Sequence, residues 1–398
     1  EELANVTIYS HHLERFPPEW EVEIFENSSW SCVHGVERWR ENCGCNSGGH
    51  PEWTQEWRKP LRSALDWLRD ELIPIYEEHA SEFLCDPWEA RDKYIQVILD
   101  RSDENIKGFL EEEAIRELSD EEKVTTLRLL EMQRHAMLMY TSCGWFFDEI
   151  SGIETTQVLQ YAGRAIQLAQ DAGGKDLEAD FARHLSNAPS NIPEHENGED
   201  IYNKFVKPAA IGVLRVGAHY AVSSLFHDYE EEDQIYCFEV KVLTQDQIQT
   251  GRFRLAVGNI SVRSLLTWDT RNISYAVLHM GDQNISGGVR EYMSDDDYQE
   301  MHKTLRESLQ LGDVPATIRG IDHHFEDHHY SLWHLFRDQQ RAIIETIFEE
   351  TETSVENFYR QVYHDHFQLM HTMTLTKNPL PKILKTTAEF VLNRDLRR

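Results

Sequence analysis

Apolar residues in the first half of the chain recur at the spacing of an α-helix. From Pro60 onward, leucine and isoleucine follow one another at steps of three and four residues, at Leu61, Leu65, Leu68, Leu72 and Ile75. This spacing predicts an amphipathic helix. Pro60 fits the first turn of that helix, whereas Pro74 is expected to kink or end it.

Further helices are predicted over residues 87–101, 104–117 and 119–142, and the last has apolar residues on several faces, as is typical of a central helix. Ser151, followed three residues later by Glu154, has the pattern of a capping box and predicts the start of another helix. The apolar face of that helix is Val158, Ala162, Ala165, Ile166 and Ala169. Together these segments predict a helical bundle.

The periodicity changes after residues 187–200, which contain two prolines, a glycine and several turn-forming residues. Such a composition indicates a boundary between domains. After one more helix, residues 236–242 and 253–257 alternate between apolar and polar side chains, as half-buried strands do. The alternation changes phase past Gly258, which suggests a bulge or tight turn. Residues 273–280 make another strand, and the short polar breaks between strands favour an antiparallel sheet.

Helical spacing returns near residues 295–310, 331–350, 354–373 and 380–395, while residues 6–9 and 21–25 are short enough to be edge strands or extended arms. The predicted fold class is therefore α+β and mainly α-helical: a helical bundle, then a small antiparallel β-sheet domain, then C-terminal helices. The predicted segments are an N-terminal arm and loop (1–57), the bundle (58–190), the sheet (200–293) and the C-terminal helical region (294–398).

Composition excludes several classes of protein. With 39 basic and 70 acidic residues among 398, the net charge is −31, which repels nucleic acid and anionic membranes. The sequence contains no long apolar run that would span a bilayer. Six scattered cysteines in so long a chain do not resemble a disulfide framework, so a reducing cytoplasm is expected.

The stretch from Ser28 to Trp57 is the richest in chemistry. It holds four tryptophans, three cysteines and two histidines, and glycines interrupt it. Tryptophan rings are suited to stacking on sugar rings or to capping a hydrophobic core, and both interpretations remain open. Loops of this kind often form functional sites.

Several motifs together resemble one known family. They are Phe-Pro-Pro at 16–18, Ser-Ser-Trp-Ser-Cys at 28–32, Cys-Gly-Cys at 43–45, the run TSCGWFFDEI at 141–150 and LHMGDQN at 278–284. The chain resembles a branch of glycoside hydrolase family 57 in which a catalytic barrel precedes a C-terminal domain of unknown function, number 3536.

The resemblance implies an enzyme that acts on α-glucans, by hydrolysis, glycosyl transfer or branching. The nucleophilic glutamate of that family and its acid/base aspartate, in an Asp-Gly-Glu type motif, have no counterpart in this sequence. We therefore expect the chain, which begins at Glu1 rather than methionine, to be the accessory C-terminal part of a longer protein with its catalytic barrel upstream. No catalytic residue and no cofactor is assigned to the chain, and alone it is expected to be inactive.

The expected sugar-binding residues are Trp30, His34, Trp39, Trp145, Asp148 and Glu149. Aromatic rings stack on the apolar face of a sugar, and carboxylates accept hydrogen bonds from its hydroxyl pairs. These residues are predicted to lie on one concave surface, because antiparallel packing of the bundle brings the loop near the end of the 119–142 helix. The competing interpretation is core packing, with Asp148 as a helix-cap partner.

Cys32, His34, Cys43 and Cys45 have the ligand types for zinc, but their spacing matches no standard finger or ribbon. Reduced thiols packed under a lid are the favoured interpretation. His324 and His328 share a helical spacing, yet a solvated helix is favoured over a metal pair. No metal is assigned. The rival functions are a non-catalytic carbohydrate-binding or architectural module and, less favoured, a Cys/His metalloprotein.

Overall fold

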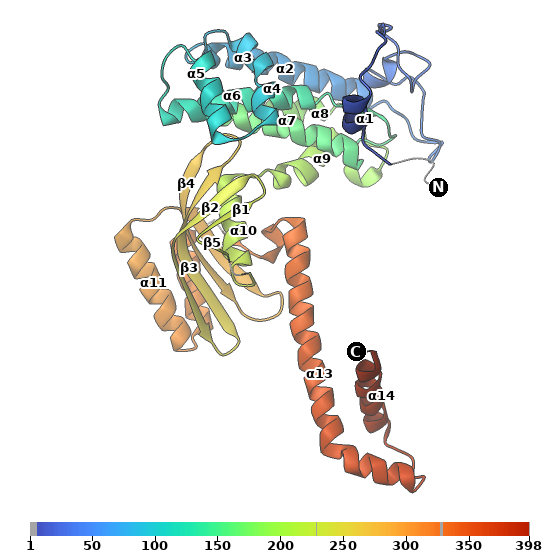
Figure 1. The fold of residues 1–398 in the computed structure, drawn as a ribbon, viewed down its shortest axis with the longest axis vertical. Helices are drawn as coiled ribbons and strands as arrows, with labels where there is room; N and C mark the ends of the chain where they lie inside the picture. Colours follow the sequence, from blue (N-terminus) through green and yellow to red (C-terminus); the bar gives the residue numbers. More distant parts are fainter. Residues whose placement is uncertain (1–5, 228, 327–328, 398) are drawn as a thin grey trace. The chain divides into compact units, whose positions relative to one another are not determined.

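The computed structural model describes residues 6–227, 229–326 and 329–397. The chain divides into two compact units, Glu1–Ala210 and Ile211–Arg398 (Figure 1). The first unit is helical, and the second contains the sheet and the C-terminal helices. The predicted mainly helical α+β class is confirmed.

The helical unit is a bundle whose longest members are α2 (Arg58–Ala80), α6 (Asp120–Leu138) and α7 (Ile153–Asp171), joined by α8 (Glu178–Leu185). Helix α6 packs on α7, and α2 packs on α6 and α8. The leucines predicted to form the inner face of α2 are fully buried, as are the central positions of α7. Burial of these apolar stripes supplies most of the stability of such a bundle.

Pro74, which was predicted to kink or end α2, does not end it. The helix continues to Ala80, and Leu72, Tyr76 and Ala80 on either side of the proline are fully buried. A proline removes one backbone hydrogen bond. Burial of one apolar residue on each neighbouring turn contributes about as much as that bond costs, so the helix persists.

Short helices complete this unit: α3 (Pro87–Lys93), α4 (Ile95–Leu99), α5 (Asp103–Glu113), α9 (Gly198–Ile201) and α1 (Tyr9–Arg15). The single helix predicted over 87–101 is divided at Tyr94, whose hydroxyl donates to buried Glu131. The capping box predicted at Ser151 and Glu154 is absent, because α7 begins after Gly152. A capping box is present instead at the start of α6, where Ser119 and Glu122 exchange hydrogen bonds.

The N-terminal segment is irregular. Residues 6–8 and 21–25 form no strand, and between residue 16 and α2 the described backbone has only one short 3₁₀ turn, Glu37–Trp39. None of the described helices combines the length and apolar character needed to cross a bilayer.

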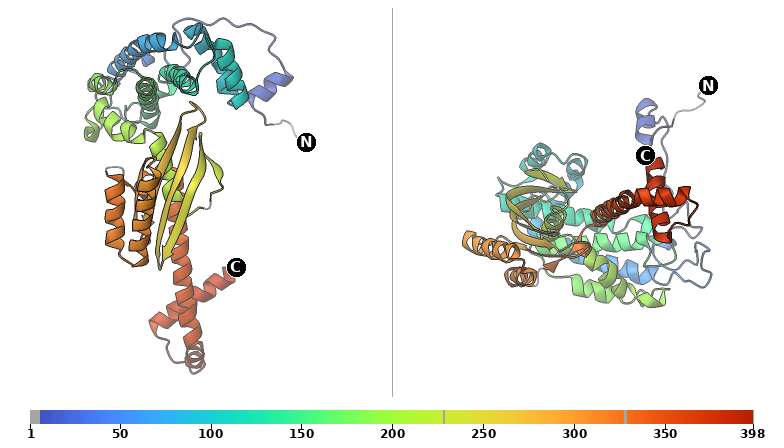
Figure 2. Two further views of the ribbon diagram at one scale, coloured as in Figure 1. Left: turned by 90° about the vertical axis from the view of Figure 1, so that its left-hand side faces the viewer. Right: turned by 90° about the horizontal axis from the view of Figure 1, so that it is seen from below.

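The second unit is built on an antiparallel sheet with strands in sequential order: β1 (Glu232–Ile235), β2 (Phe238–Thr250), β3 (Phe253–Ser264), β4 (Thr270–His279), β5 (Ile285–Glu291) and β6 (His329–Tyr330). Helix α10 (Val213–Ser223) covers one face, and α11 (Asp295–Gln310) and α12 (Val314–Phe325) cover the other (Figure 2). The antiparallel prediction for residues 210–290 is confirmed.

The change of phase in β3 was predicted to mark a bulge or a tight turn, and a bulge is present at this position, in the neighbouring strand β2. Strand β3 pairs with β4 without interruption, while the bulge lies in β2, between Val242 and Thr244. Leu255 and Val257 pack beneath α11 and α12, whereas Ile260 and Val262 belong to the core on the α10 side. The strand therefore buries opposite faces at its two ends, because different helices cover them.

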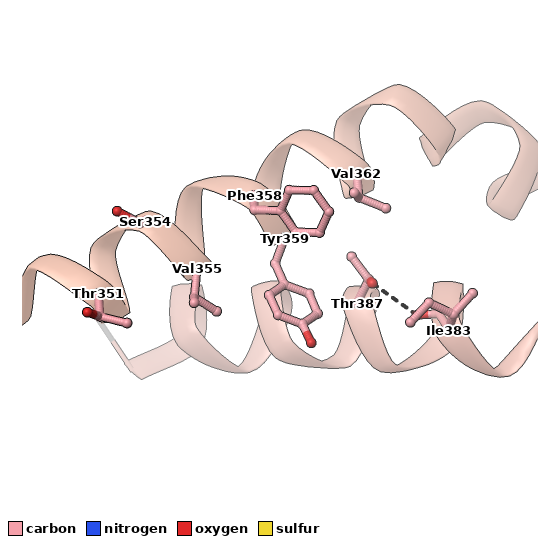
Figure 3. Close-up of a pocket in the computed structure, with 8 residues that line it drawn as sticks. All are labelled: Thr351, Ser354, Val355, Phe358, Tyr359, Val362, Ile383 and Thr387. Carbon is pink, nitrogen blue, oxygen red and sulfur yellow. Dashed lines mark hydrogen bonds between the residues drawn. The ribbon is translucent and has the colours of Figure 1, made fainter. Parts of the chain in front are cut away.

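The C-terminal helices form a hairpin of α13 (Arg337–Leu375) and α14 (Lys382–Arg397). The two helices predicted over 331–350 and 354–373 are one continuous helix. Arg360 on α13 pairs with Asp395 on α14 at 2.6 Å, and Arg394 pairs with Glu356 at 2.7 Å. Between the helices lies an apolar groove lined by Val355, Phe358, Tyr359, Val362 and Ile383 (Figure 3).

His219 on α10 makes the sheet unit sensitive to acid. Its ring is 3% exposed and lies against Phe336, with centroids 4.5 Å apart. Burial lowers the pKa of His219 to about 4. Because the folded state binds this proton less readily than the unfolded state, stability is fully present above the ordinary histidine pKa and falls as pH drops from about 6.5 towards 4.

We expect the wild-type sheet unit to lose about 2 kcal/mol of stability through His219 between pH 7.5 and pH 5. Hydrogen exchange of α10 peptides, compared at each pH between wild type and His219→Gln, measures this loss. The difference in stability between wild type and His219→Gln should change by about 2 kcal/mol between pH 7.5 and pH 5. A pH-independent difference would refute the assignment, and His371→Gln, at an exposed position on α13, is the matched control.

Candidate functional site

The loop from Ser28 to Trp57 packs against the segment that follows α6. The indole Nε1 of Trp39 donates to the carbonyl of Ser142 at 3.3 Å, and Arg62 on α2 donates to the carbonyl of Trp39 at 3.3 Å. The predicted proximity of the loop to the 142–149 segment is therefore present, although more than a hundred residues separate them. The individual side chains, however, fall into two groups.

Trp30, Trp39 and Phe146 form one group at the surface, here named the aromatic platform. Trp30 is 88% exposed, and its ring centroid lies 5.6 Å from that of Phe146. Trp39 meets Phe146 edge to face at 6.0 Å, and the guanidinium of Arg38 lies 5.3 Å from the centre of the Phe146 ring. These rings therefore present apolar surface beside the positive charge of Arg38, and the Trp30 ring is largely exposed to solvent.

Trp145 belongs to the interior instead. It is 1% exposed and stacks on Trp57, which is fully buried, with centroids 6.1 Å apart and planes inclined by 18°. Gly144 allows the close packing, because a Cβ there would lie 2.5 Å from a methyl group of Val158. Trp145 thus supports the platform from beneath and presents no face to solvent.

Asp148 fastens the loop to the bundle. Its carboxylate is buried and accepts hydrogen bonds from the Ser47 backbone N–H at 2.8 Å and from Gln55 Nε2 at 3.1 Å, and it also accepts from the Ser47 hydroxyl. The loop donors come from residues about a hundred positions earlier. With its oxygens already engaged, Asp148 positions the loop.

Glu149 does the same for a second crossing segment. Its carboxylate is 5% exposed and accepts from the Ser190 hydroxyl at 2.6 Å and from the Asn191 backbone N–H at 2.7 Å. The Asn191 side chain in turn donates to the Asp148 carbonyl at 2.8 Å. The adjacent carboxylates therefore tie together the loop, the end of α6 and the 190–191 turn.

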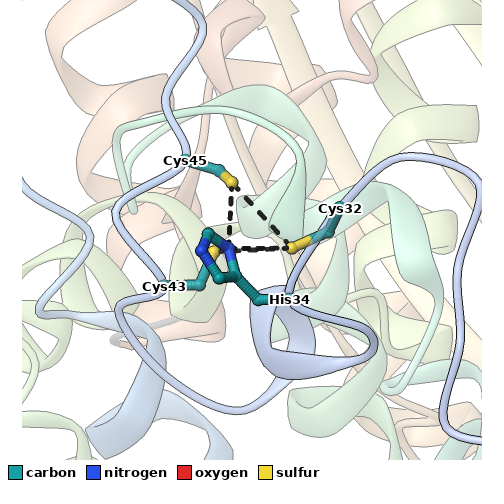
Figure 4. Close-up of side chains that lie close together, drawn as sticks. All are labelled: Cys32, His34, Cys43 and Cys45. Carbon is teal, nitrogen blue, oxygen red and sulfur yellow. Dashed lines mark hydrogen bonds between the residues drawn. The ribbon is translucent and has the colours of Figure 1, made fainter.

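His34 lies in a cluster with Cys32, Cys43 and Cys45 (Figure 4). Their ligand atoms lie within 4.8 Å of one another, and the cysteines are free thiols. Burial raises the pKa of Cys32, but hydrogen bonds from His34 and the other two cysteines outweigh it and bring the pKa to about 6. The sequence spacing did not predict this convergence, because the loop that creates it has no regular secondary structure.

Arg58 is a residue of the site that the sequence-based prediction missed. It is fully buried at the start of α2, and its guanidinium donates to Cys43 Sγ at 3.9 Å and to the Phe147 carbonyl at 3.3 Å. Burial lowers the pKa of Arg58, an effect opposed by the nearby thiol Cys43. The predicted helix began at Pro60, after Arg58, and no local pattern there indicated its burial.

The other histidine cluster is only partly described. His323 and His324 lie at the end of α12, with ring centroids 5.1 Å apart, whereas His328, the second member of the predicted pair, lies outside the described residues. Burial lowers the pKa of His324. Nothing further follows for a metal pair at this position.

Comparison with known proteins gives a family for the chain. No curated protein and no solved structure matched it. The sequence profile described as "Domain of unknown function (DUF3536)" matches residues 53–336, from the end of the Trp-rich loop through the sheet unit to the residue before α13. Since this match covers more than half of the chain, the protein belongs to the DUF3536 family.

Proposed function

We propose that this chain is the accessory C-terminal region of a glycoside hydrolase family 57-like enzyme that acts on α-glucans. In this proposal the catalytic carboxylates and their barrel lie upstream, in a cytoplasmic protein. The accessory region contributes one wall of the sugar cleft. Whether the reaction is hydrolysis, glycosyl transfer or branching depends on the upstream barrel.

The aromatic platform is the observation that supports this proposal. An indole ring that is 88% exposed and supported from behind by Phe146 has the form of a sugar-stacking surface. Neighbouring exposed aromatic side chains mark interaction sites more often than scattered single ones do. Trp39 widens the surface, and the guanidinium of Arg38 places hydrogen-bond donors beside it, as polyhydroxylated ligands require.

The proposed sugar contacts are therefore Trp30 and Trp39. Trp145, Asp148 and Glu149 act beneath them by holding the loop, and His34 acts through the cysteine cluster. This division refines the six predicted residues into contacting and supporting ones. The division rests on two observations: whether a side chain is exposed, and whether its polar atoms already have buried hydrogen-bond partners.

Replacing Trp30 with alanine in the protein that includes the upstream region is expected to weaken binding of maltoheptaose by about 1–3 kcal/mol, the contribution of one stacked aromatic ring. Isothermal titration calorimetry measures the loss. Trp333→Ala removes another exposed indole, in the sheet unit, and is the matched control that should bind as wild type does. Equal affinity of Trp30→Ala and wild type would exclude the platform as a glucan contact.

A non-catalytic carbohydrate-binding or architectural module is the alternative function. It uses the same platform but needs no barrel, so the chain Glu1–Arg398 alone would bind glucan with the affinity of the longer protein. The accessory-region proposal expects weaker binding by the chain alone, because most of the cleft is upstream. The same titration on both proteins distinguishes them.

A further inference from the structure

We propose that Cys32, His34, Cys43 and Cys45 form a four-coordinate structural zinc site. The four side chains come from two turns of the irregular loop and point at a common centre (Figure 4). The site is independent of any sugar chemistry, and it would hold the aromatic platform in place.

Four of the six distances between the ligand atoms are those of a tetrahedron around zinc, and the other two are at most 4.8 Å. With Zn–S of about 2.3 Å and Zn–N of about 2.0–2.1 Å, tetrahedral angles separate two sulfurs by about 3.8 Å and a sulfur from a nitrogen by about 3.6 Å. Cys32 Sγ lies 3.8 Å from Cys43 Sγ and 3.9 Å from Cys45 Sγ. His34 Nδ1 lies 3.7 Å from Cys32 Sγ and 3.6 Å from Cys45 Sγ.

A disulfide does not explain this arrangement. A disulfide joins only two sulfurs, at about 2.05 Å. It would not explain why a third cysteine and a histidine lie at the same place. Here one sulfur, that of Cys32, is at nearly equal distance from two others, and the imidazole nitrogen faces two of the three. Three soft thiolates and one imidazole form a ligand set typical of structural zinc.

The charges of the cluster and of neighbouring Arg58 also favour a bound zinc ion. Zinc with three thiolates and a neutral imidazole carries a net charge of −1, whereas three thiolates without a metal would carry −3. Arg58 is fully buried and donates to Cys43 Sγ, so it supplies one positive charge at the cluster. Metal ligands commonly accept such a bond from a neighbouring group.

The backbone is shaped to bring the ligands together. Gly35 follows His34 with φ +70°, and its N–H donates to the Cys32 carbonyl at 3.2 Å. A Cβ at Gly35 would lie 2.4 Å from the Asn27 carbonyl oxygen, and Gly44, with φ +77°, separates Cys43 from Cys45. Both turns use the left-handed conformation that favours glycine.

Zinc binding would stabilise this irregular segment in place of a hydrophobic core. The described backbone from residue 16 to α2 contains only one 3₁₀ turn, and long irregular segments need another source of order. Trp30 precedes the first ligand by two residues, and Trp39 lies between the two ligand pairs. All four positions of the tetrahedron are protein side chains, which is typical of a structural rather than a catalytic site.

Metal analysis of the purified full chain, prepared without chelator, tests the proposal. We expect inductively coupled plasma mass spectrometry to find close to one zinc per chain. After the zinc is exchanged for Co²⁺, the visible bands of tetrahedral cobalt and the near-ultraviolet absorption of cobalt thiolates should appear. Cys43→Ser should lower the zinc content severalfold, while Cys85→Ser, an exposed cysteine outside the cluster, should keep it.

A ligand exchange keeps the test decisive even if Cys43→Ser does not fold. His34→Cys retains four ligands, so it should still bind one zinc and should show stronger cobalt-thiolate absorption than wild type. His34→Ala should bind less tightly in competition with a chelator. Folded wild-type protein that contains no zinc and gives no cobalt-thiolate absorption would overturn the proposal, as would a disulfide in the cluster of protein purified under reducing conditions.

Discussion

Trp145→Ala is expected to lower the free energy of unfolding of the helical unit by about 3–5 kcal/mol, the usual cost of removing a large buried aromatic side chain. Trp145 is 1% exposed and stacks on the fully buried Trp57. The substitution leaves a cavity between the start of α2 and the turn after α6, where close packing does not readily collapse. Urea unfolding followed by tryptophan fluorescence reports on this unit, because eight of the ten tryptophans precede residue 211.

Trp30→Ala is the matched control, since it removes the same side chain from a neighbouring surface position. With 88% of the residue exposed, its loss should change stability by no more than about 0.5 kcal/mol. Equal destabilisation by the two substitutions would contradict the assignment of Trp145 to the interior and Trp30 to the surface.

Glu131→Gln is expected to destabilise the same unit by about 3 kcal/mol, because it removes a negative charge from a buried network of hydrogen-bonded partners. Glu131 is fully buried on α6 and accepts from the Tyr94 hydroxyl at 2.8 Å and from Arg101 at 2.6 Å. Arg134 donates to its other oxygen at 3.2 Å. Glutamine has the same shape but cannot balance two arginines.

Acid should have the same effect as this substitution. Burial by itself raises the pKa of Glu131, but the charge of Arg101 and the hydrogen bonds from Arg101 and Tyr94 outweigh burial, so the pKa lies below its usual value. The stabilisation is therefore present above the ordinary glutamate pKa and is lost as pH falls through the lowered one. Glu121→Gln, at an exposed position in the first turn of the same helix, should lower stability by no more than about 1 kcal/mol, the contribution of an exposed charge to the helix dipole.

Apolar spacing was a reliable guide wherever one face of an element is buried along its whole length. Helices α7 and α11 and strand β4 begin and end within a few residues of their predicted limits. In each of them the buried face repeats with the period of the element, because a helix or strand contacts the core with one side. The antiparallel order followed from the short polar breaks between strands.

Local signals failed where distant partners decided the outcome. Pro74 was expected to kink or end α2, but the helix continues past it to Ala80, with buried neighbours on both sides. The phase change in β3 was interpreted as a bulge or tight turn; the bulge lies in the neighbouring strand β2, and the sequence does not record that α10 covers one face of the sheet and α11 and α12 the other. The gap between 350 and 354 was interpreted as a break, yet α13 runs through it.

The sequence by itself determined the fold class, the antiparallel character of the sheet and the choice of the candidate site region, because burial periodicity and residue composition are local properties of the chain. Only the tertiary structure decided which tryptophan is exposed, which carboxylates are already engaged and that Cys32, His34, Cys43 and Cys45 converge. An irregular loop has no period that fixes its side-chain directions. Its geometry depends on glycine turns and on contacts with residues about a hundred positions away, and those contacts exist only once the bundle has folded.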